Sequence, residues 1–279
     1  MNESNQAQRD YWRTRLAWVE RQEQMDLQLG VFGLAAMEAL GDISGTNVLD
    51  VGCGCGHTTL QLNERVGSGS VVGVDISEKL LEVARRRGSG AIEFIEADAQ
   101  SHAPQGPYDI IFSRFGVMFF ADPIAAFRNL RASTSEVAKL SMVCWQGPEQ
   151  NPWMTVPNRA AMSLVDLPPR SPDAPDPFSF ADSDWVREIL EHAGWTNVDV
   201  ADFRTEVKIG GGVNSRLAAL HAYEFSPVKA VVDSDPGIRS DSVVDLMEAA
   251  LPPHQQDGIV LLPAAARIVT ADTYTESRP

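Results

Sequence analysis

The chain has 279 residues, of which 44% are hydrophobic, and this is enough to bury a large core without disulfides or metals. Its 38 acidic and 23 basic side chains give a formal net charge of −15, so no nucleic-acid partner is expected. Three cysteines do not make a secreted disulfide framework, and no run approaches the roughly 18 apolar residues of a spanning helix. The polar first residues carry no apolar signal core. We therefore expect a cytoplasmic, soluble protein with no membrane span.

The first 40 residues are expected to be helical. Two sets of apolar side chains recur there at helical spacing, namely Trp12, Leu16 and Val19, then Met25, Leu29 and Phe32. The pattern predicts two helices, or one bent helix, over residues 8–40. Trp12 and Trp18 are candidates for a lid over a ligand, with plain core packing as the alternative.

From residue 47 onward, short apolar strands alternate with amphipathic helices. Strands are predicted over residues 47–51, 70–75, 91–96, 109–113 and 137–145. Helices are predicted between them, over residues 58–66, 78–87 with Ser77 as N-cap, and 122–131 with Pro123 at the first helical position. Such alternation is typical of a parallel sheet covered on both faces. The expected fold class is therefore α/β, a Rossmann-like doubly wound sheet.

Prolines interrupt this rhythm after Trp145. Residues 147–181 are predicted to be a lid insertion with one helix at about 153–165. A helix over 182–192, a strand over 197–207, a helical insertion at about 210–256 and a last strand over 258–271, interrupted by Pro263, complete the chain. The predicted division is an N-terminal helical lid (1–44), a cofactor-binding core (45–146), the lid insertion, and a C-terminal part of the core (182–279).

The first predicted strand runs directly into a glycine loop. Gly52, Gly54 and Gly56 occupy every second position, which lets the backbone turn tightly and approach a ligand. The loop follows a strand, where open α/β sheets bind their ligands. A dinucleotide fingerprint reads Gly-x-Gly-x-x-Gly, but His57 occupies the position of its last glycine. A phosphate-binding nucleotide-hydrolase loop needs a Lys-Ser/Thr pair, and none follows here. The ligand class that remains is a nucleoside without a pyrophosphate.

Two acidic residues follow the next strands. Asp75 ends the second strand, where a carboxylate can accept hydrogen bonds from both ribose hydroxyls; a cap before Ser77 is the alternative. After the third strand, Asp98 could accept from an adenine amino group, and the Ala99 amide could donate to a ring nitrogen; the alternative is a surface turn. Together these positions predict an adenosine site.

Four strings of the sequence resemble the class I S-adenosylmethionine-dependent methyltransferases, in that family's order and spacing. They are Val-Leu-Asp-Val-Gly-Cys-Gly-Cys-Gly (48–56), Gly-Val-Asp-Ile-Ser (73–77), Glu-Ala-Asp-Ala (96–99) and Tyr-Asp-Ile-Ile-Phe-Ser (108–113). The resemblance covers about residues 45–145. Residues 113–120 and 151–154 add a likeness to the ubiquinone/menaquinone C-methyltransferase-like bacterial enzymes of small molecules. The resemblance to the class I family implies a sheet of about seven strands, of which the last is antiparallel and is supplied by residues 258–271.

The resemblance implies S-adenosyl-L-methionine as cofactor and a role for each matching residue. The loop of Gly52, Cys53, Gly54 and Gly56 would face the methionine portion. Asp50 would support the loop near the amino group, Thr58 would help hold the carboxylate, and Ser113 would lie beside the methionine chain. Asp75 would bind the ribose, Ile76 would pack on adenine, and Asp98 with Ala99 would read its edge. No second ligand pair accompanies Cys53 and Cys55, so no metal is expected.

The expected activity is methyl transfer to an O, N or C atom of a small-molecule, secondary-metabolite acceptor by in-line displacement. His221 is a candidate catalytic group, with a buried structural histidine as its alternative. Arg114 could bind an anionic substrate group, or could form a structural ion pair. Two other functions stay open: non-methylating chemistry on the same cofactor, such as cyclisation, decarboxylation or hydroxylation, and non-catalytic binding. The oligomeric state is left open between monomer and homodimer.

Overall fold

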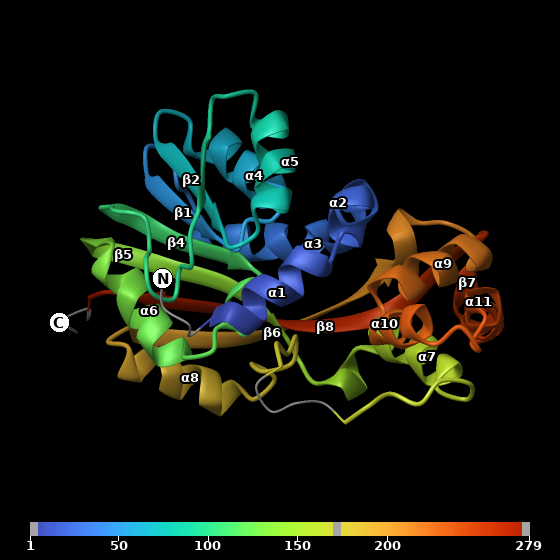
Figure 1. Ribbon diagram of the computed structural model, residues 1–279. Helices are drawn as coiled ribbons and strands as arrows, with labels where there is room; N and C mark the ends of the chain where they lie inside the picture. Colours follow the sequence, from blue (N-terminus) through green and yellow to red (C-terminus); the bar gives the residue numbers. More distant parts are fainter. Residues whose placement is uncertain (1–4, 170–173, 275–279) are drawn as a thin grey trace.

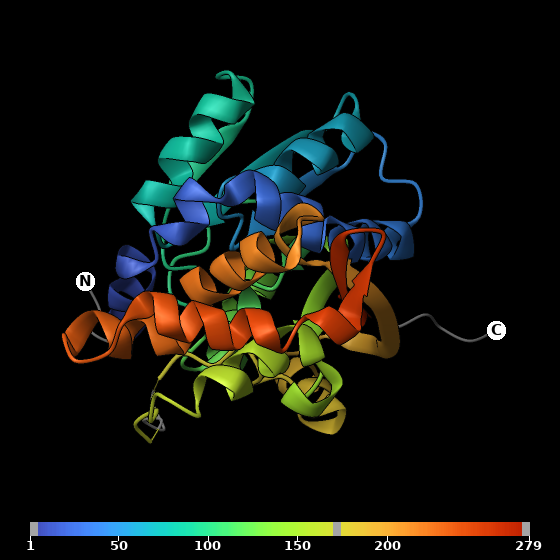
Figure 2. The same ribbon diagram turned by 90° about the vertical axis from the view of Figure 1, so that its right-hand side faces the viewer.

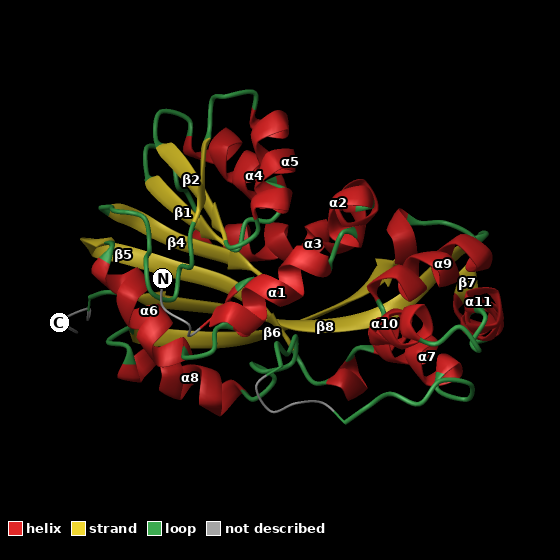
Figure 3. Cartoon of the chain, in the orientation of Figure 1, coloured by secondary structure: helices red, strands yellow, loops and turns green. Residues whose placement is uncertain are grey.

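The computed structural model describes residues 5–169 and 174–274, and its centre is one mixed sheet with helices on both faces (Figure 1, Figure 3). The strand order is β3-β2-β1-β4-β5-β8-β6. The strands are β1 (Asn47–Val51), β2 (Ser70–Asp75), β3 (Glu93–Glu96), β4 (Tyr108–Arg114), β5 (Thr134–Trp145), β6 (Thr196–Lys208), β7 (Gln255–Gln256) and β8 (Ile259–Asp272).

Strand direction follows from the connections. β1 to β5 are mutually parallel, whereas β8 runs antiparallel to both of its neighbours, β5 and β6. Val48 and Leu49 of β1 and Ile111 of β4 are fully buried, as expected for parallel strands covered on both faces. The predicted doubly wound α/β fold with an antiparallel last strand is thus confirmed.

The helices are α1 (Gln6–Thr14), α2 (Ala17–Glu20), α3 (Gln22–Leu40), α4 (His57–Val66), α5 (Glu78–Gly88), α6 (Pro123–Ala132), α7 (Pro152–Ala161), α8 (Ser183–His192), α9 (Ser215–Phe225), α10 (Pro227–Ser234) and α11 (Ser240–Ala249). α3 and α4 lie on one face of the sheet, and α6 with α8 on the other (Figure 1). In the described ranges, no helix combines the length and the apolar character that crossing a membrane requires.

Three expectations about local structure need correction. Residues 6–40 form three helices rather than two, because the backbone leaves helical angles at Arg15 and Arg21. The helix expected over 153–165 spans Pro152–Ala161 instead, and residues 162–164 continue it only as turns.

The third correction concerns Ser77. It sits at the N-cap of α5, but its side chain makes no capping hydrogen bond. The Asp75 carboxylate accepts from the Ser77 amide instead (2.9 Å), so the cap is supplied from two residues upstream.

β8 and β6 continue together beyond the edge of β5. β8 pairs with β5 only from Ala266 onward, whereas its pairing with β6 extends to Leu261. Pro263 lies in this extension, where one side of β8 has no β5 partner, so the strand tolerates it and is not interrupted. This two-stranded ribbon leads to α9, α10 and α11, which lie on the side that faces the viewer in Figure 2.

Candidate cofactor and acceptor site

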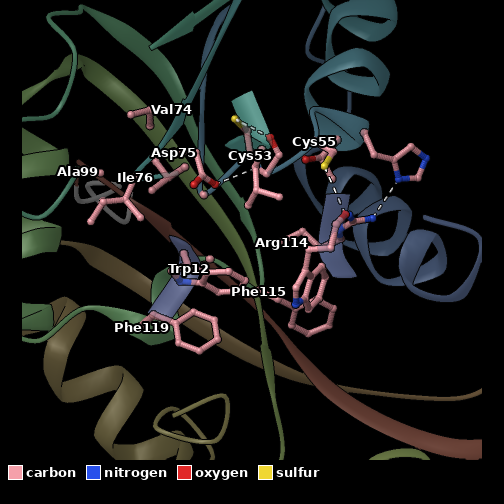
Figure 4. A pocket seen from close by; sticks show the side chains of 18 of the residues that line it. Trp12, Cys53, Cys55, Val74, Asp75, Ile76, Ala99, Arg114, Phe115 and Phe119 are labelled. Carbon is pink, nitrogen blue, oxygen red and sulfur yellow. Dashed lines mark hydrogen bonds between the residues drawn. The ribbon is translucent and has the colours of Figure 1, made fainter. Parts of the chain in front are cut away.

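A cavity lies where the carboxyl ends of the parallel strands meet the N-terminal helices (Figure 4). We call it the first cavity. The strand side contributes the loops after β1, β2, β3 and β4, and the opposite wall contributes residues of α1, α2 and α3. Its sheet-side lining is Val51, Gly52, Cys53, Gly54, Cys55, Val74, Asp75, Ile76, Ala97, Asp98, Ala99, Arg114, Phe115 and Gly116.

The glycine loop depends on backbone angles that only glycine adopts easily. Gly52 has φ +69°, and a Cβ there would lie 2.7 Å from the Cα of Gly116. Gly54 has φ +55°, but a Cβ there would meet nothing within 4 Å, because its open side is the cavity. Gly52 is therefore required for packing of the loop on the β4 end, and Gly54 keeps the ligand side open.

Asp75 joins the loop to the end of β2. One carboxylate oxygen accepts from the Gly54 amide (2.9 Å) and the other from the Ser77 amide (2.9 Å), and the side chain lines the first cavity. Burial raises the pKa of this carboxyl to about 6, against the lowering effect of those hydrogen bonds. The ribose-binding and capping alternatives are compatible, since each oxygen has a second lone pair.

The residues expected around adenine lie together at one end of the cavity. Ile76, Asp98 and Ala99 all line it, and Asp98 is 7% exposed. Asp98 holds its own turn by accepting from the Gln100 amide (3.0 Å). Asn5, which comes before α1, donates to the same Asp98 oxygen (2.7 Å), so the N-terminal segment reaches this end of the cavity.

Two residues expected near the cofactor, Asp50 and Ser113, lie beneath the lining of the first cavity. Asp50 is fully buried beneath the loop and is not part of the cavity lining; its Oδ2 accepts from the hydroxyls of Thr58 and Thr59 (2.7 Å each). Burial raises the Asp50 pKa to about 6. Ser113 is also fully buried and off the lining, and donates to the Val51 carbonyl (2.8 Å). In the structure, Asp50 and Ser113 thus support the loop from beneath, as the sequence predicts for Asp50, and the Thr58 hydroxyl donates to Asp50, although Thr58 lines the cavity.

A charged network that the sequence gave no reason to expect closes the loop end of the cavity. Asp26 of α3 lies 2.9 Å from Arg87, 3.4 Å from His57 and 3.8 Å from Arg114. Arg114 also contacts His57 Nδ1 at 3.1 Å. Desolvation lowers the pKa of His57 to about 4, so the imidazole is neutral near pH 7. Two guanidinium groups then face one carboxylate, which leaves the network with a net positive charge.

This arrangement is compatible with both interpretations of Arg114. The guanidinium is paired with Asp26, as the ion-pair alternative expects, and it lines the first cavity beside Cys55 (Figure 4). Arg114 is absent from the lining of the second cavity described below. The Arg114 guanidinium can therefore contact a ligand of the first cavity but not one of the second.

A second, mainly aromatic cavity adjoins the first. The two share six lining residues: Trp12, Trp18, Met25, Leu29, Phe115 and Phe119. Further rings come from Tyr11, Trp145, Trp153 and Phe225, and the charged side chain is Arg15. Trp145 and Phe115 stack with their centroids 3.8 Å apart. Flat apolar molecules fit such a lining.

His221 of α9 is the ionisable imidazole of this second cavity. It is 3% exposed, and neither ring nitrogen has a hydrogen-bond partner among the described residues. Desolvation lowers the His221 pKa to about 4. A buried neutral imidazole with both nitrogens unpaired can accept a hydrogen bond from a ligand.

The two loop cysteines do not face one another. Cys53 packs in a small cluster with Leu81, Ala84, Ile92 and Phe94, whereas the Cys55 thiol points to the Trp18 carbonyl (3.6 Å). Burial raises the pKa of Cys55 to about 12, which keeps it a thiol. Within residues 5–169 and 174–274, no group of three or more His, Cys, Asp or Glu side chains is placed to hold a metal ion.

Comparison with known proteins agrees with this site. The family model described as "Methyltransferase domain" matches residues 48–136. A demethylmenaquinone methyltransferase of Lactococcus lactis is 32% identical over 100 residues, which are 34% of this chain and 40% of that protein. A trans-aconitate 2-methyltransferase of Rhizobium etli is 35% identical over 94 residues, 34% of this chain and 36% of that protein. The chain thus spans about two fifths of the curated relatives it matches.

A solved structure resembles the fold more widely. The YcgJ protein of Bacillus subtilis superposes with a TM-score of 0.55 at 17% identity, over 88% of this chain and 98% of that one. The loop, strand ends and cavity described above all fall in or beside the segment that the family model matches. Residues 48–136 therefore match a methyltransferase domain, and both curated relatives are bacterial proteins named as methyltransferases of small molecules.

Proposed function

We propose that this protein transfers a methyl group from S-adenosylmethionine, bound in the first cavity, to an O, N or C atom of a small molecule bound in the second. The observation that carries the proposal is the shared wall of six residues between the two cavities. In-line displacement needs donor and acceptor about 3–3.5 Å apart, with the nucleophile opposite the leaving group. Adjoining cavities with a common boundary suit that geometry.

The residues of the first cavity fit the cofactor part by part. Asp75 would bind the ribose hydroxyls, and Ile76, Asp98 and Ala99 would surround the adenine. The methionine portion would lie along Gly52, Cys53 and Gly54, with Gly56 completing the turn. We assign the methionine carboxylate to Arg114 and His57, because the Asp26 network carries excess positive charge there. Asp50, Thr58 and Ser113 would act by holding the loop.

When bound, S-adenosylmethionine supplies an electrophilic methyl group on a sulfonium sulfur. The protein's own contribution is to orient the acceptor, exclude water and manage its proton. His221 would accept a hydrogen bond from an acceptor hydroxyl or amine, since its ring nitrogens are unpaired and neutral. The aromatic residues of α1 and α2 would keep water from the transfer path.

The lining of the second cavity favours one acceptor class. Aromatic rings dominate it, and Arg15 is its cation, so a planar, largely apolar acceptor with one ionisable group fits better than a tricarboxylate. Of the two curated relatives above, one is named for a quinone precursor and the other for trans-aconitate. The ring lining supports the first kind, an aromatic or polyketide-like molecule.

The predicted division of the chain gives the parts their roles in this proposal. Residues 1–44 and 147–181 would be the lid, residues 45–146 the cofactor-binding core, and the helical insertion at about 210–256 would supply His221. We place the enzyme in the cytoplasm, which the three free cysteines support, and give it no nucleic-acid partner, which its acidity supports. A monomer or homodimer both suit the site.

Methyl transfer can be tested directly. The protein is incubated with methyl-deuterated S-adenosylmethionine and a panel that contains hydroxylated naphthoquinones, aromatic polyketides and trans-aconitate, and products are weighed by mass spectrometry. The proposal expects a labelled methyl on an aromatic acceptor. A product of other mass would favour the non-methylating alternative, and tight S-adenosylhomocysteine binding with no product from any pool would favour a binding protein.

The role of His221 has its own test once an acceptor is known. His221→Phe keeps an aromatic ring but removes both nitrogens, and kcat is expected to fall by about 10²-fold. Affinity for S-adenosylhomocysteine should stay unchanged, because His221 does not line the first cavity. Tyr223→Phe is the matched control, a buried neighbour outside both linings. An unchanged kcat in His221→Phe would assign the histidine to packing.

A further inference from the structure

The N-terminal helix presents incompletely bonded amide groups at the adenine end of the first cavity. Gln8 lines the cavity, is 8% exposed, and its Nε2 has no hydrogen-bond partner among the described residues. Asn5 is 2% exposed, and its Oδ1 is likewise unpaired in the described part of the chain. A buried donor left unsatisfied destabilises a protein by about 1–3 kcal/mol. The Gln8 amide is therefore poised for a partner that enters the cavity.

Helical spacing fixes where Gln8 points. Gln8 and Trp12 are four residues apart, so they share one face of α1, and Asn5 is the N-cap residue three positions before Gln8. At one end of that face, Asn5 Nδ2 donates to Asp98 (2.7 Å). At the other, the ring of Trp12 meets Phe119 edge-on at 5.1 Å. Gln8 lies between these two contacts, on the wall that runs from the Asp98 turn to Phe119.

We propose that Gln8 is a cofactor-recognition residue, whose Nε2 donates to a ring nitrogen of the adenine base. Asn5 is a positioning residue, because its bond to Asp98 fixes the start of α1 over the base. The inference rests on the proposed function, since it takes S-adenosylmethionine to be the ligand of the first cavity. It assigns part of the cofactor site to residues 5–12, outside the segment that the family model matches.

Donor and acceptor needs of the base support this assignment. Asp98 as a carboxylate can only accept, so it can serve the amino group of adenine but none of its ring nitrogens. Its Oδ1 already takes bonds from Asn5 and from the Gln100 amide, which fixes its direction. The Ala99 amide is the donor expected for one ring nitrogen, and Gln8 adds a side-chain donor in the same cavity for another.

Calorimetry with four ligands tests the inference. The probes are S-adenosylhomocysteine and its 1-deaza, 3-deaza and 7-deaza analogues, each of which lacks one ring nitrogen. Gln8→Met keeps the side-chain length but has no donor, and should bind S-adenosylhomocysteine about ten-fold more weakly. One deaza analogue should bind the wild type equally weakly, and Gln8→Met should cause no further loss with that analogue. Gln6→Met, an exposed change on the same helix, is the matched control and should bind as the wild type.

A purely structural role gives a different result. Asn5→Ala should weaken all four ligands by one common factor, because it loosens α1 as a whole. The inference is overturned if Gln8→Met binds S-adenosylhomocysteine as tightly as the wild type does. It is also overturned if the variant binds every analogue more weakly than the wild type by the same factor. Wild-type protein that binds none of the probes would remove the proposed function as well, so the two failures are distinguishable. Circular dichroism of each variant confirms that it is folded.

Discussion

Two glycines of one loop meet different surroundings at the scale of single residues. A methyl group at Gly52 would collide with the Gly116 backbone, whereas one at Gly54 would project into the first cavity. Gly52→Ala is therefore expected to lower the free energy of unfolding by at least about 2 kcal/mol, because both strain and overlap act on the fold. Gly54→Ala should cost about 1 kcal/mol from backbone strain alone.

Ligand binding should separate these two variants further. Gly54→Ala is expected to remain folded but to bind S-adenosylhomocysteine at least about ten-fold more weakly, because the added methyl group occupies ligand space. Urea denaturation and calorimetry on the same preparations measure both quantities. Equal stability losses in the two variants would contradict the placement of the loop against β4.

Asp50 should give the protein a recognisable dependence on pH. Its pKa is raised by burial from 3.8 to about 6, so the folded state holds this proton more tightly than the unfolded chain does. Stability from this group is therefore present below pH 4 and is lost as the pH rises to about 6. Relative to Asp50→Asn, the wild type should lose about 2 kcal/mol of unfolding free energy between pH 4 and pH 7.

Denaturant titrations of both proteins across that range check this expectation. Asn can still accept from the Thr58 and Thr59 hydroxyls, so the variant is a close substitute. A difference between the two proteins that does not vary with pH would show that Asp50 titrates normally.

Sequence reasoning found the site residues that directly follow strands, since the carboxyl ends of parallel strands converge. Asp75 and Asp98 belong to this class, and both line the first cavity. It could not tell that Ser113 lies beneath the cavity lining, because the apolar run of β4 does not report depth. Gln8 and Asp26 had no local signature at all, since their roles depend on contacts with residues far along the chain.

At the scale of elements, the buried side chain of Asn151 helps to tie the segment after β5 to the sheet. Asn151, fully buried before α7, donates to the Gln146 and Ala265 carbonyls and accepts from the Ala265 amide (3.0–3.1 Å). It also accepts from the Trp153 indole (3.2 Å). The Asn-Pro-Trp-Met string that resembles small-molecule methyltransferases thus has a structural role here, in joining α7 to β8.

Removing this side chain should be costly. Asn151→Ala leaves the Ala265 amide and carbonyl without side-chain partners, so the free energy of unfolding should fall by about 2–4 kcal/mol. Asn63→Ala, a partly exposed change on α4, serves as control and should stay within about 0.5 kcal/mol of the wild type. Thermal and urea unfolding measure the difference. Similar losses of unfolding free energy in both variants would contradict a stabilising role of Asn151.

Elements with strong periodicity were predicted well, but the residues at which they begin and end were predicted less accurately. The last strand matched closely, from 258–271 expected to Ile259–Asp272 observed. The break at Arg21 falls between the two predicted sets of apolar residues, whereas the break at Arg15 lies within the set of Trp12, Leu16 and Val19, whose helical spacing continues across it. The course of the β6–β8 ribbon past β5 depends on pairs 53 to 61 positions apart, from Lys208 with Leu261 to Arg204 with Ala265, which no local pattern records.

On the scale of the whole molecule, this ribbon links the cofactor-binding core to the helices that carry His221. β8 pairs with β5 at one end and continues beside β6 toward α9 at the other. We expect core and insertion to unfold together, in a single transition that fluorescence and circular dichroism report alike. S-Adenosylhomocysteine at 100 times its Kd should raise the free energy of unfolding for this single transition by about 2.7 kcal/mol.

Hydrogen exchange resolves the same question by region. Amides of α11, far from the first cavity, should gain protection with the ligand if unfolding is cooperative. Protection confined to α1 and the loops of the first cavity would indicate that the C-terminal helices open independently.

The aromatic boundary between the cavities also gives the protein an intrinsic optical signal. Four of its six tryptophans, Trp12, Trp18, Trp145 and Trp153, line one or both cavities. A planar acceptor seated among these indoles would quench their emission by energy transfer, while the cofactor alone would perturb only Trp12 and Trp18. Occupancy of donor and acceptor places can therefore be followed separately in unlabelled protein, and a library of molecules can be screened by light before any product is known.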